Sequence, residues 1–320
     1  MSTTTRYLSD AQLAELRRLS PLRGLGSFAF TWALIASSFV LYCRWPGVLT
    51  FLVMWVVVST RHLALAILMH EAAHCLVLRS KRANELVGNW LAAYPTMVKT
   101  EVYRAYHLVH HRETWTDADP DLELAKPFPI TRSSFWRKVL RDLTGQTGWQ
   151  RYRMLARLSS GLSPKGQGLE GRSLGSVLRD FVATQRGFLI TNGAMLAALT
   201  AAGHPEAYLL GWVLPAFTGY SLVLRLRSIA EHAAIDDAAD PLRNTRTTIA
   251  SLPERLFLAP HNVNFHLEHH LFMFVPHYRL PAAHRMLLKA GVLDDAEIAS
   301  GYLDVLRRAT SKPESAESAA

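Results

Sequence analysis

The sequence predicts an all-α integral membrane protein, with four transmembrane helices in two hairpins and a cytosolic helical cap. Three observations lead to this fold class. The apolar residues, 49% of a 320-residue chain, gather into long stretches. Arginines stand at the ends of these stretches, and three runs of closely spaced histidines lie in the segments outside them. We therefore expect a cytosolic N-terminal segment at residues 1–26, a membrane domain at 27–309 and a disordered polar tail at 310–320.

The overall charge and the cysteine content exclude several classes of protein. A formal charge of +9 suits either nucleic acid or an anionic membrane surface. The basic residues flank hydrophobic stretches and form no separate basic domain, so we expect no nucleic-acid partner. The two cysteines, Cys43 and Cys75, belong to no CxxC pair, which argues against a disulfide framework, an iron–sulfur cluster and a zinc ribbon. The first residues lack the features of a secretory signal, so we expect no cleaved leader.

The first predicted hairpin comprises residues 27–43 and 48–69, joined by a tight turn at 44–47. Each segment approaches the roughly 20 apolar residues that a membrane span needs. Arg61 interrupts the second segment. A charged side chain at the bilayer centre costs at least ~2.5 kcal/mol. We therefore expect Arg61 to lie near a membrane surface or to face protein.

No segment between residues 79 and 186 is apolar enough for a confident span. Residues 86–98 are apolar but short and are interrupted by Pro95, which favours a buried or re-entrant helix. Residues 135–143 place apolar side chains on one side and basic ones on the other, as in a helix lying in the membrane interface or an ordinary surface helix. Residues 159–176 are rich in glycine and serine and are expected to form a flexible loop.

The second predicted hairpin comprises residues 188–202 and 207–224, with a turn at 203–206. Arg225 and Arg227 follow it, so the layout of the first hairpin is repeated. The two short turns carry one arginine between them, whereas the N-terminal segment is rich in basic residues. The positive-inside rule then places both termini and all the histidine runs in the cytoplasm, and we expect a multi-pass protein of a bacterial inner membrane. Residues 280–306 have the pattern of soluble helices.

The histidine runs are the strongest functional signal. On a helix, positions i, i+3 and i+4 lie on one face, so each run directs its imidazoles to one side. Imidazole is the commonest metal ligand in proteins, and packing alone does not explain three such runs. We predict a metal centre, and we expect the isolated His62, His204, His277 and His284 to be structural, with His261 undecided. The runs contain eight of the fourteen histidines: His70 and His74; His107, His110 and His111; and His266, His269 and His270.

The number of imidazoles points to two metal ions. A single tetrahedral zinc takes four ligands, and eight or nine nitrogens suit two ions with positions left open. Imidazole binds iron, copper and zinc, but a redox-active pair beside a lipid-facing pocket favours iron and dioxygen. Two alternatives remain. The first run also matches the HExxH motif of a zinc protease within the membrane, which would leave the other runs without a role. A non-catalytic membrane protein could use the histidines to carry or sense metal.

Together the three runs, their order and the four spans resemble the membrane fatty acid desaturase and hydroxylase superfamily, from about residue 27 to about residue 285. Residues 61–74, 227–232 and 262–281 carry the further similarity. Three residues separate the histidines of the first run, as in acyl-lipid desaturases. One departure is Met273, at a position where many relatives have proline, and we expect it to affect only a local turn.

The resemblance implies a centre of two iron ions with O2 as co-substrate. It also implies that a histidine after the fourth span, here His232, joins the other eight as a ninth ligand. Acidic residues near the runs are expected to orient the imidazoles through their second nitrogen. These candidates are Glu71, Glu113, Asp117, Asp119, Asp121, Glu231 and Glu268.

The implied reaction is the introduction of a double bond into a fatty acyl chain of a lipid. The same scaffold could instead perform hydroxylation or ketolation of a carotenoid, a sphingolipid or an alkane. No cytochrome b5 motif is fused to the chain, so electrons are expected from a separate ferredoxin or cytochrome-type donor with its reductase. We expect Arg137, Lys138 and Arg141 to help dock an acidic donor.

Overall fold

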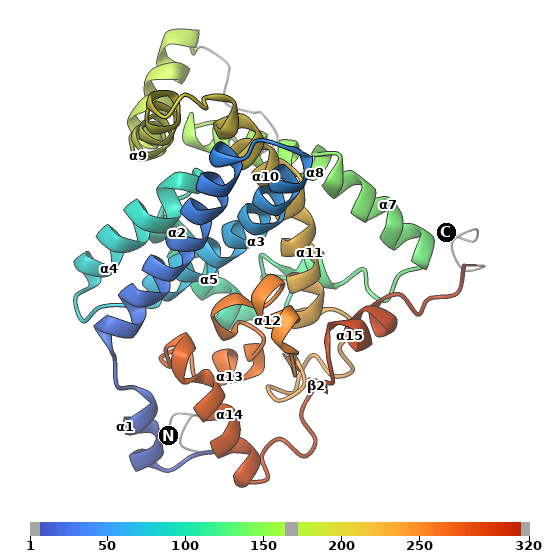
Figure 1. Cartoon of the computed structure of the whole chain (residues 1–320). Helices are drawn as coiled ribbons and strands as arrows, with labels where there is room; N and C mark the ends of the chain where they lie inside the picture. The colour runs from blue at the N-terminus through green and yellow to red at the C-terminus, as the bar shows by residue number, and fades with distance from the viewer. Residues whose placement is uncertain (1–6, 164–171, 315–320) are drawn as a thin grey trace.

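The structure is a computed structural model that describes residues 7–163 and 172–314, and nearly all of its elements are helices (Figure 1). Within these residues the only strands are β1 (Thr247–Thr248) and β2 (Ile298–Ala299), which pair in parallel. The predicted all-α class is thus confirmed. Part of the predicted loop (164–171) and most of the predicted tail (315–320) lie outside the described residues.

Among the residues that the structure describes, three helical segments are long and apolar enough to cross a membrane. They are α2 (Pro21–Arg44), α3 (Val48–Ala73) and the continuous run Tyr208–His232, which comprises η4 (Tyr208–Val213), α10 (Leu214–Phe217) and α11 (Gly219–His232). At 1.5 Å per residue such segments extend about 36–39 Å, more than the roughly 30 Å of a bilayer's hydrocarbon core. The remaining predicted span lies within α9 (Leu174–Ala201), which bends at Gln185 and is not among the three candidates.

Helix α3 is the centre of the fold. Nearly every side chain from Val58 to Ala73 is buried, and α3 packs against α2, α5 (Thr100–Glu113) and α11. A helix that is apolar all round belongs in the interior of a bundle. Arg61 lies in this buried half, and its guanidinium donates to the carbonyl oxygen of Leu256. Of the two expected positions for this charge, the structure therefore shows the one facing protein.

The segment that connects the end of α3 to the start of α5 folds back into the protein. It comprises α4 (Lys81–Gly88), the π-helix η2 (Asn89–Ala93) and the short 3-10 helix η3 (Tyr94–Thr96). Ala92 and Ala93 are buried, in agreement with the predicted buried or re-entrant helix. The Asn89 side chain accepts a hydrogen bond from the backbone N–H of Thr100, the first residue of α5 (Thr100–Glu113), and so fixes the start of that helix.

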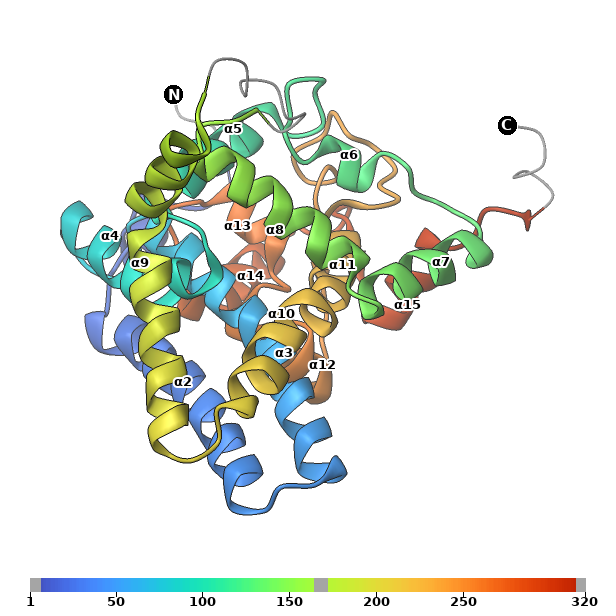
Figure 2. The ribbon, with the colours of Figure 1, turned by 90° about the horizontal axis from the view of Figure 1, so that it is seen from above.

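Three helices then run along the outside of the bundle: α6 (Leu122–Ala125), α7 (Arg132–Leu143) and α8 (Gln146–Ser159). Helix α7 buries Phe135 and Val139 and exposes Trp136 and Leu140. In Figure 2 the run of α7 and α8 lies crosswise to the length of α9. The amphipathic pattern is therefore present, and its location at a membrane surface stays a prediction.

The C-terminal helices gather at one end of the bundle (Figure 1). A hydrophobic core joins α1 (Asp10–Leu16) to α14 (Leu280–Lys289), with Leu16 and Leu287 fully buried. The helices expected within residues 280–306 are α14 and the first part of α15 (Tyr302–Ala309). The remaining elements of this region are α12 (Leu252–Phe257), η5 (Pro260–Asn262), α13 (His266–Leu271), η6 (His277–Arg279) and α15 (Tyr302–Ala309).

Candidate metal centre

Eight histidines, from the C-terminal end of α3 and the residue after it and from α5, α11 and α13, form two groups of four. Within each group, one ring nitrogen of every histidine lies within 4.8 Å of the others. All eight side chains are buried or half-buried. The first group is His70, His74, His107 and His269, and the second is His110, His232, His266 and His270.

The two groups are neighbours because α5 and α13 each contribute to both. On α5, His107 belongs to the first group and His110 to the second, and their ring centroids are 5.6 Å apart. On α13, His269 and His270 divide in the same way, with centroids 5.8 Å apart. The i, i+3 and i+4 spacing therefore supplies imidazoles to two adjacent sites along one helix face.

His111 lies beside the first group. Its Nε2 atom is 2.9 Å from Nε2 of His107 and 3.0 Å from Nε2 of His269. Its ring is also close to the second group, with a centroid 4.3 Å from that of His270. The structure thus brings together all nine histidines named from the sequence and the resemblance, although they come from four distant segments.

The arrangement fits bound metal ions. Two imidazole nitrogens that bind one ion at about 2.1 Å, roughly at right angles, lie about 3 Å apart. The Nε2 atoms of His232 and His266 are 2.9 Å apart, and those of His111 and His107 have the same separation. Within the described residues, the buried Nε2 atoms of His74 and His270 have no hydrogen-bond partner. Such an atom costs about 1–3 kcal/mol unless something binds it, and an ion would do so.

The protonation state of the cluster also suits a metal. Burial, and then repulsion from the neighbouring histidines, lowers the pKa of His107, His269 and His270 well below the ordinary value. These imidazoles are therefore neutral at physiological pH. Neutral imidazole is the form that offers a lone pair to a metal ion.

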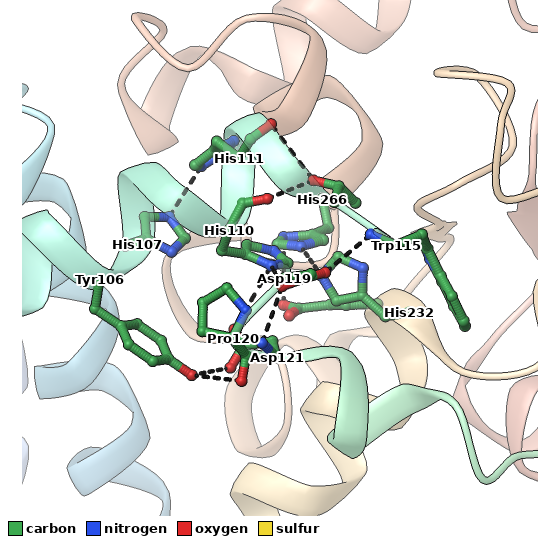
Figure 3. Close-up of polar contacts among 12 residues, drawn as sticks. Tyr106, His107, His110, His111, Trp115, Asp119, Pro120, Asp121, His232 and His266 are labelled. Carbon is green, nitrogen blue, oxygen red and sulfur yellow. Dashed lines mark hydrogen bonds and ion pairs between the residues drawn. The ribbon is translucent and has the colours of Figure 1, made fainter. Parts of the chain in front are cut away.

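Carboxylates lie next to the second nitrogen of two imidazoles, and one of these rings is held by a hydrogen bond. Nδ1 of His110 donates to the carboxylate of Asp119 at 2.8 Å, and Figure 3 shows that carboxylate between His110 and Trp115. Oxygens of Asp121 and Glu231 lie 3.8 Å from Nδ1 of His110 and 3.6 Å from Nδ1 of His266, respectively. The hydrogen bond to Asp119 orients the His110 ring and directs its other nitrogen toward the centre of the group, whereas the oxygens of Asp121 and Glu231 lie nearby without forming a hydrogen bond to these rings.

Asp119 is itself fixed and ionised. Its two oxygens accept hydrogen bonds from the backbone N–H groups of Trp115 and Asp121, both at 2.9 Å. Burial acts to raise the pKa of Asp119, but the hydrogen bonds from His110 and from the two backbone groups outweigh it, and the pKa is lowered. The carboxylate is therefore charged and accepts only, which keeps a proton on Nδ1 of His110 and leaves its Nε2 free.

The other acidic candidates contact different groups. Glu71 accepts from the backbone N–H of His277, and Glu268 accepts from His284 and Thr247. Glu113 pairs with its neighbour Arg112 near the surface, and Asp117 is exposed. The structure therefore places three of the seven acidic candidates, Asp119, Asp121 and Glu231, next to ring nitrogens of the cluster.

Two residues at the centre were not among the candidates. The hydroxyl of Tyr103 lies 3.2 Å from Nδ1 of His70. Its position four residues before His107, on the same face of α5, was the signal that could have found it. Arg227 forms an ion pair with the buried Glu231 one turn later on α11, whereas the sequence suggested only that it marks the end of a span.

A cavity of about 250 Å³ opens beside both histidine groups. Leu63, Ile67, Val98 and Leu224 form much of its apolar wall, while His70, His107, His110, His232 and His266 form another part. Tyr106, Asp121 and Arg227 add polar groups to the lining. A largely apolar space with a few convergent polar groups is typical of a small-molecule site.

Comparison with known proteins agrees with this centre. The fatty acid desaturase family model matches residues 44–299. Dihydrorhizobitoxine desaturase of Bradyrhizobium elkanii is 25% identical over 69% of this chain, and the match covers 62% of that protein's own length. The sn-1 acyl-lipid omega-3 desaturase (ferredoxin) of Synechocystis is 24% identical over 88% of this chain and 79% of its own.

A beta-carotene ketolase of Paracoccus is 25% identical over 68% of this chain and 72% of its own. The family match spans most of the sequence and includes all nine histidines of the centre. The family match and the named desaturases also support the assignment of this chain as an oxidoreductase of membranes. The chain therefore belongs to the fatty acid desaturase family, within the superfamily of membrane desaturases and hydroxylases.

Proposed function

We propose that the protein is a di-iron membrane enzyme that uses O2 to introduce a double bond into a fatty acyl chain of a lipid. One observation carries this proposal: two adjacent groups of buried or half-buried imidazoles border one largely apolar cavity. Family membership and the acyl-lipid desaturases among the relatives support an oxidoreductase acting on lipid.

We assign the nine histidines to two iron ions. His70, His74, His107, His111 and His269 would hold one ion, and His110, His232, His266 and His270 the other. Iron bound there would supply the redox chemistry by which O2 removes hydrogen from an unactivated CH2 group.

The protein's own residues perform three tasks in this scheme. Asp119 keeps the proton on Nδ1 of His110, so that Nε2 is available to metal. Tyr103 fixes the ring of His70 at the wall of the cavity. The apolar side chains of the cavity exclude water and hold an acyl chain against the histidines, so that one carbon of the chain lies next to the centre.

The membrane arrangement is proposed from the same pattern. We place four spans in two hairpins, with α9 as the third in sequence, and a cytosolic helical cap. Residues 27–309 form one membrane domain, and both termini and the histidines face the cytoplasm of a bacterial inner membrane. Electrons would come from a separate ferredoxin or cytochrome-type donor with its reductase. The printed name of the Synechocystis relative includes ferredoxin, which supports such a donor.

Ketolation or hydroxylation is the second candidate, because two beta-carotene ketolases are among the relatives. Expression in a host of known lipid and carotenoid content, followed by mass spectrometry, separates the two reactions. Loss of two hydrogens from an acyl chain supports desaturation, whereas gain of oxygen supports the second candidate.

The His110→Ala variant should abolish either product. The matched control is His204→Ala, since His204 lies in the turn after α9 and pairs only with Glu206 among the described residues. Unchanged lipids and carotenoids in cells that contain folded, iron-loaded wild-type protein and its reduced donor would refute both reactions on these substrates.

A further inference from the structure

A second cavity, of about 150 Å³, adjoins the one beside the histidines. It is lined by residues of α6, α7, α8 and α11; α6 and α7 both pack against α11, and α7 and α8 lie end to end in Figure 2. Leu124, Leu224 and Ser228 line both cavities. These three side chains therefore form the boundary between the second cavity and the space that borders the metal centre.

The charges around the second cavity are mostly positive. Lys138, Arg151 and Arg225 line it, against the single exposed carboxylate of Glu123. Arg225 is neutralised by the buried carboxylate of Asp142, with contacts of 2.5 and 2.9 Å. Neither of the other two cations forms an ion pair with the residues that the structure describes, although the Asp142 carboxylate also lies near enough to Lys138 to interact with its charge.

Arg151 donates to the hydroxyl of Ser221 and to the carbonyl oxygen of Ala216, which are both uncharged groups. The Lys138 ammonium makes no hydrogen bond or ion pair in the described part of the chain. Burial, and then the positive charge of Arg225, lowers the pKa of Lys138. An anion placed in the cavity would stabilise both charges.

We propose that the second cavity binds the negatively charged head of the acyl substrate, a carboxylate or a phosphate. The acyl chain would then pass Leu124, Leu224 and Ser228 to reach the histidines. This inference rests on the proposed function, since it names the substrate class that the same centre accepts. An ammonium and a guanidinium without an acidic partner are the groups that recognise such anions.

The surroundings of the cavity favour a lipid as the source of the anion. Trp136 and Leu140 flank Lys138 along α7 and are exposed, and Trp149 on α8 is exposed as well. Large apolar side chains next to basic ones are typical of helices at a membrane surface. A lipid in the adjacent leaflet would therefore have its head close to Lys138 and its chain close to the apolar wall.

The test measures binding by the purified full-length protein in detergent, without donor and without turnover. Oleate is compared with methyl oleate, and dioctanoyl phosphatidate with dioctanoylglycerol, so that each pair differs in charge. We expect wild type to bind at least one anion more tightly than its neutral partner. Lys138→Gln should weaken binding of that anion roughly 5- to 20-fold and leave the neutral partner unchanged.

Two variants on α7 sharpen the result. Lys138→Arg should restore anion binding, because the charge is kept. Arg141→Gln removes the same charge from the same helix but outside the cavity lining, so it should bind as wild type does. The preferred pair identifies carboxylate or phosphate, and competition by inorganic phosphate would show that the head alone is recognised.

The inference is overturned if the charged and neutral ligands bind alike, or if Lys138→Gln and Arg141→Gln behave alike. Failure of the proposed function would look different. In that case the anion would still bind through Lys138, but the iron-loaded protein with O2 and a reduced donor would form no product from it. Product formation without charge-selective binding would contradict the inference alone.

Discussion

Replacing Asp119 by asparagine should weaken one metal site and spare the other. The carboxylate accepts three hydrogen bonds: Oδ1 from Nδ1 of His110 and the backbone N–H of Asp121, and Oδ2 from the backbone N–H of Trp115. An amide has only one oxygen. If that oxygen occupies the Oδ1 position, the amide nitrogen must face the Trp115 N–H, and two donors oppose each other.

The magnitude follows from these contacts. At least one of the three hydrogen bonds is lost, and the bond to His110 is no longer assisted by charge. A hydrogen bond to a charged group contributes about 1.5–3 kcal/mol, against about 0.5–1.5 kcal/mol for a neutral one. The His110 ring loses roughly 1–3 kcal/mol of support, which corresponds to about 5- to 150-fold in metal affinity. We expect this loss at the group of His110, His232, His266 and His270 only.

Anaerobic titration of the metal-free protein with ferrous iron, in competition with a chelator, measures the affinity of each site. The first site is an internal control for folding, because no Asp119 contact reaches its histidines. Asp117→Asn is the matched control, since Asp117 is exposed and lies two residues earlier in the same loop. Equal affinity at both sites in Asp119→Asn and wild type would refute the role assigned to this carboxylate.

Three further predictions concern the centre and the fold. Tyr103→Phe removes the hydrogen bond to His70 and should lower iron affinity at the first site by up to about tenfold in the same titration; no change would contradict its positioning role. Two arginines, Arg246 and Arg308, pair with the buried Glu297, and only Arg246 is fully buried. Arg246→Leu should therefore lower the free energy of unfolding in denaturant and detergent by about 3 kcal/mol. Arg308→Leu removes the half-exposed partner and should lower it by less than about 1 kcal/mol. Equal costs would count against a buried pair. Removal of iron by a chelator should lower the melting temperature and abolish turnover, and added iron should restore both; an unchanged melting temperature would argue against metal at the core of the fold.

The ligand residues could be predicted because helix periodicity is a local property. The spacing alone places His107, His110 and His111 on one face of α5, and the same spacing does so for the histidines of α13. Their division between two groups could not be predicted, because it depends on how α5, α11 and α13 meet. The ninth histidine, His232, stands alone in the sequence and was identified only through the resemblance.

Other features depend on contacts between distant residues and left little local signal. Strands β1 and β2 are two residues each and lie about fifty residues apart, so no period-two pattern could reveal them. For Arg61 the sequence left two positions open, and its partner, the Leu256 carbonyl, lies 195 positions later. The third predicted span is a different case: α9 is helical where expected and, at 28 residues, long enough, but its composition does not make it a candidate crossing.

The measurement that tests the central claim most directly is the metal content of the purified full-length protein after loading with ferrous iron. Elemental analysis against protein concentration should give two iron ions per chain. A value well below one, or a preparation that is active with zinc and no iron, would contradict the assignment of the nine histidines to a di-iron centre.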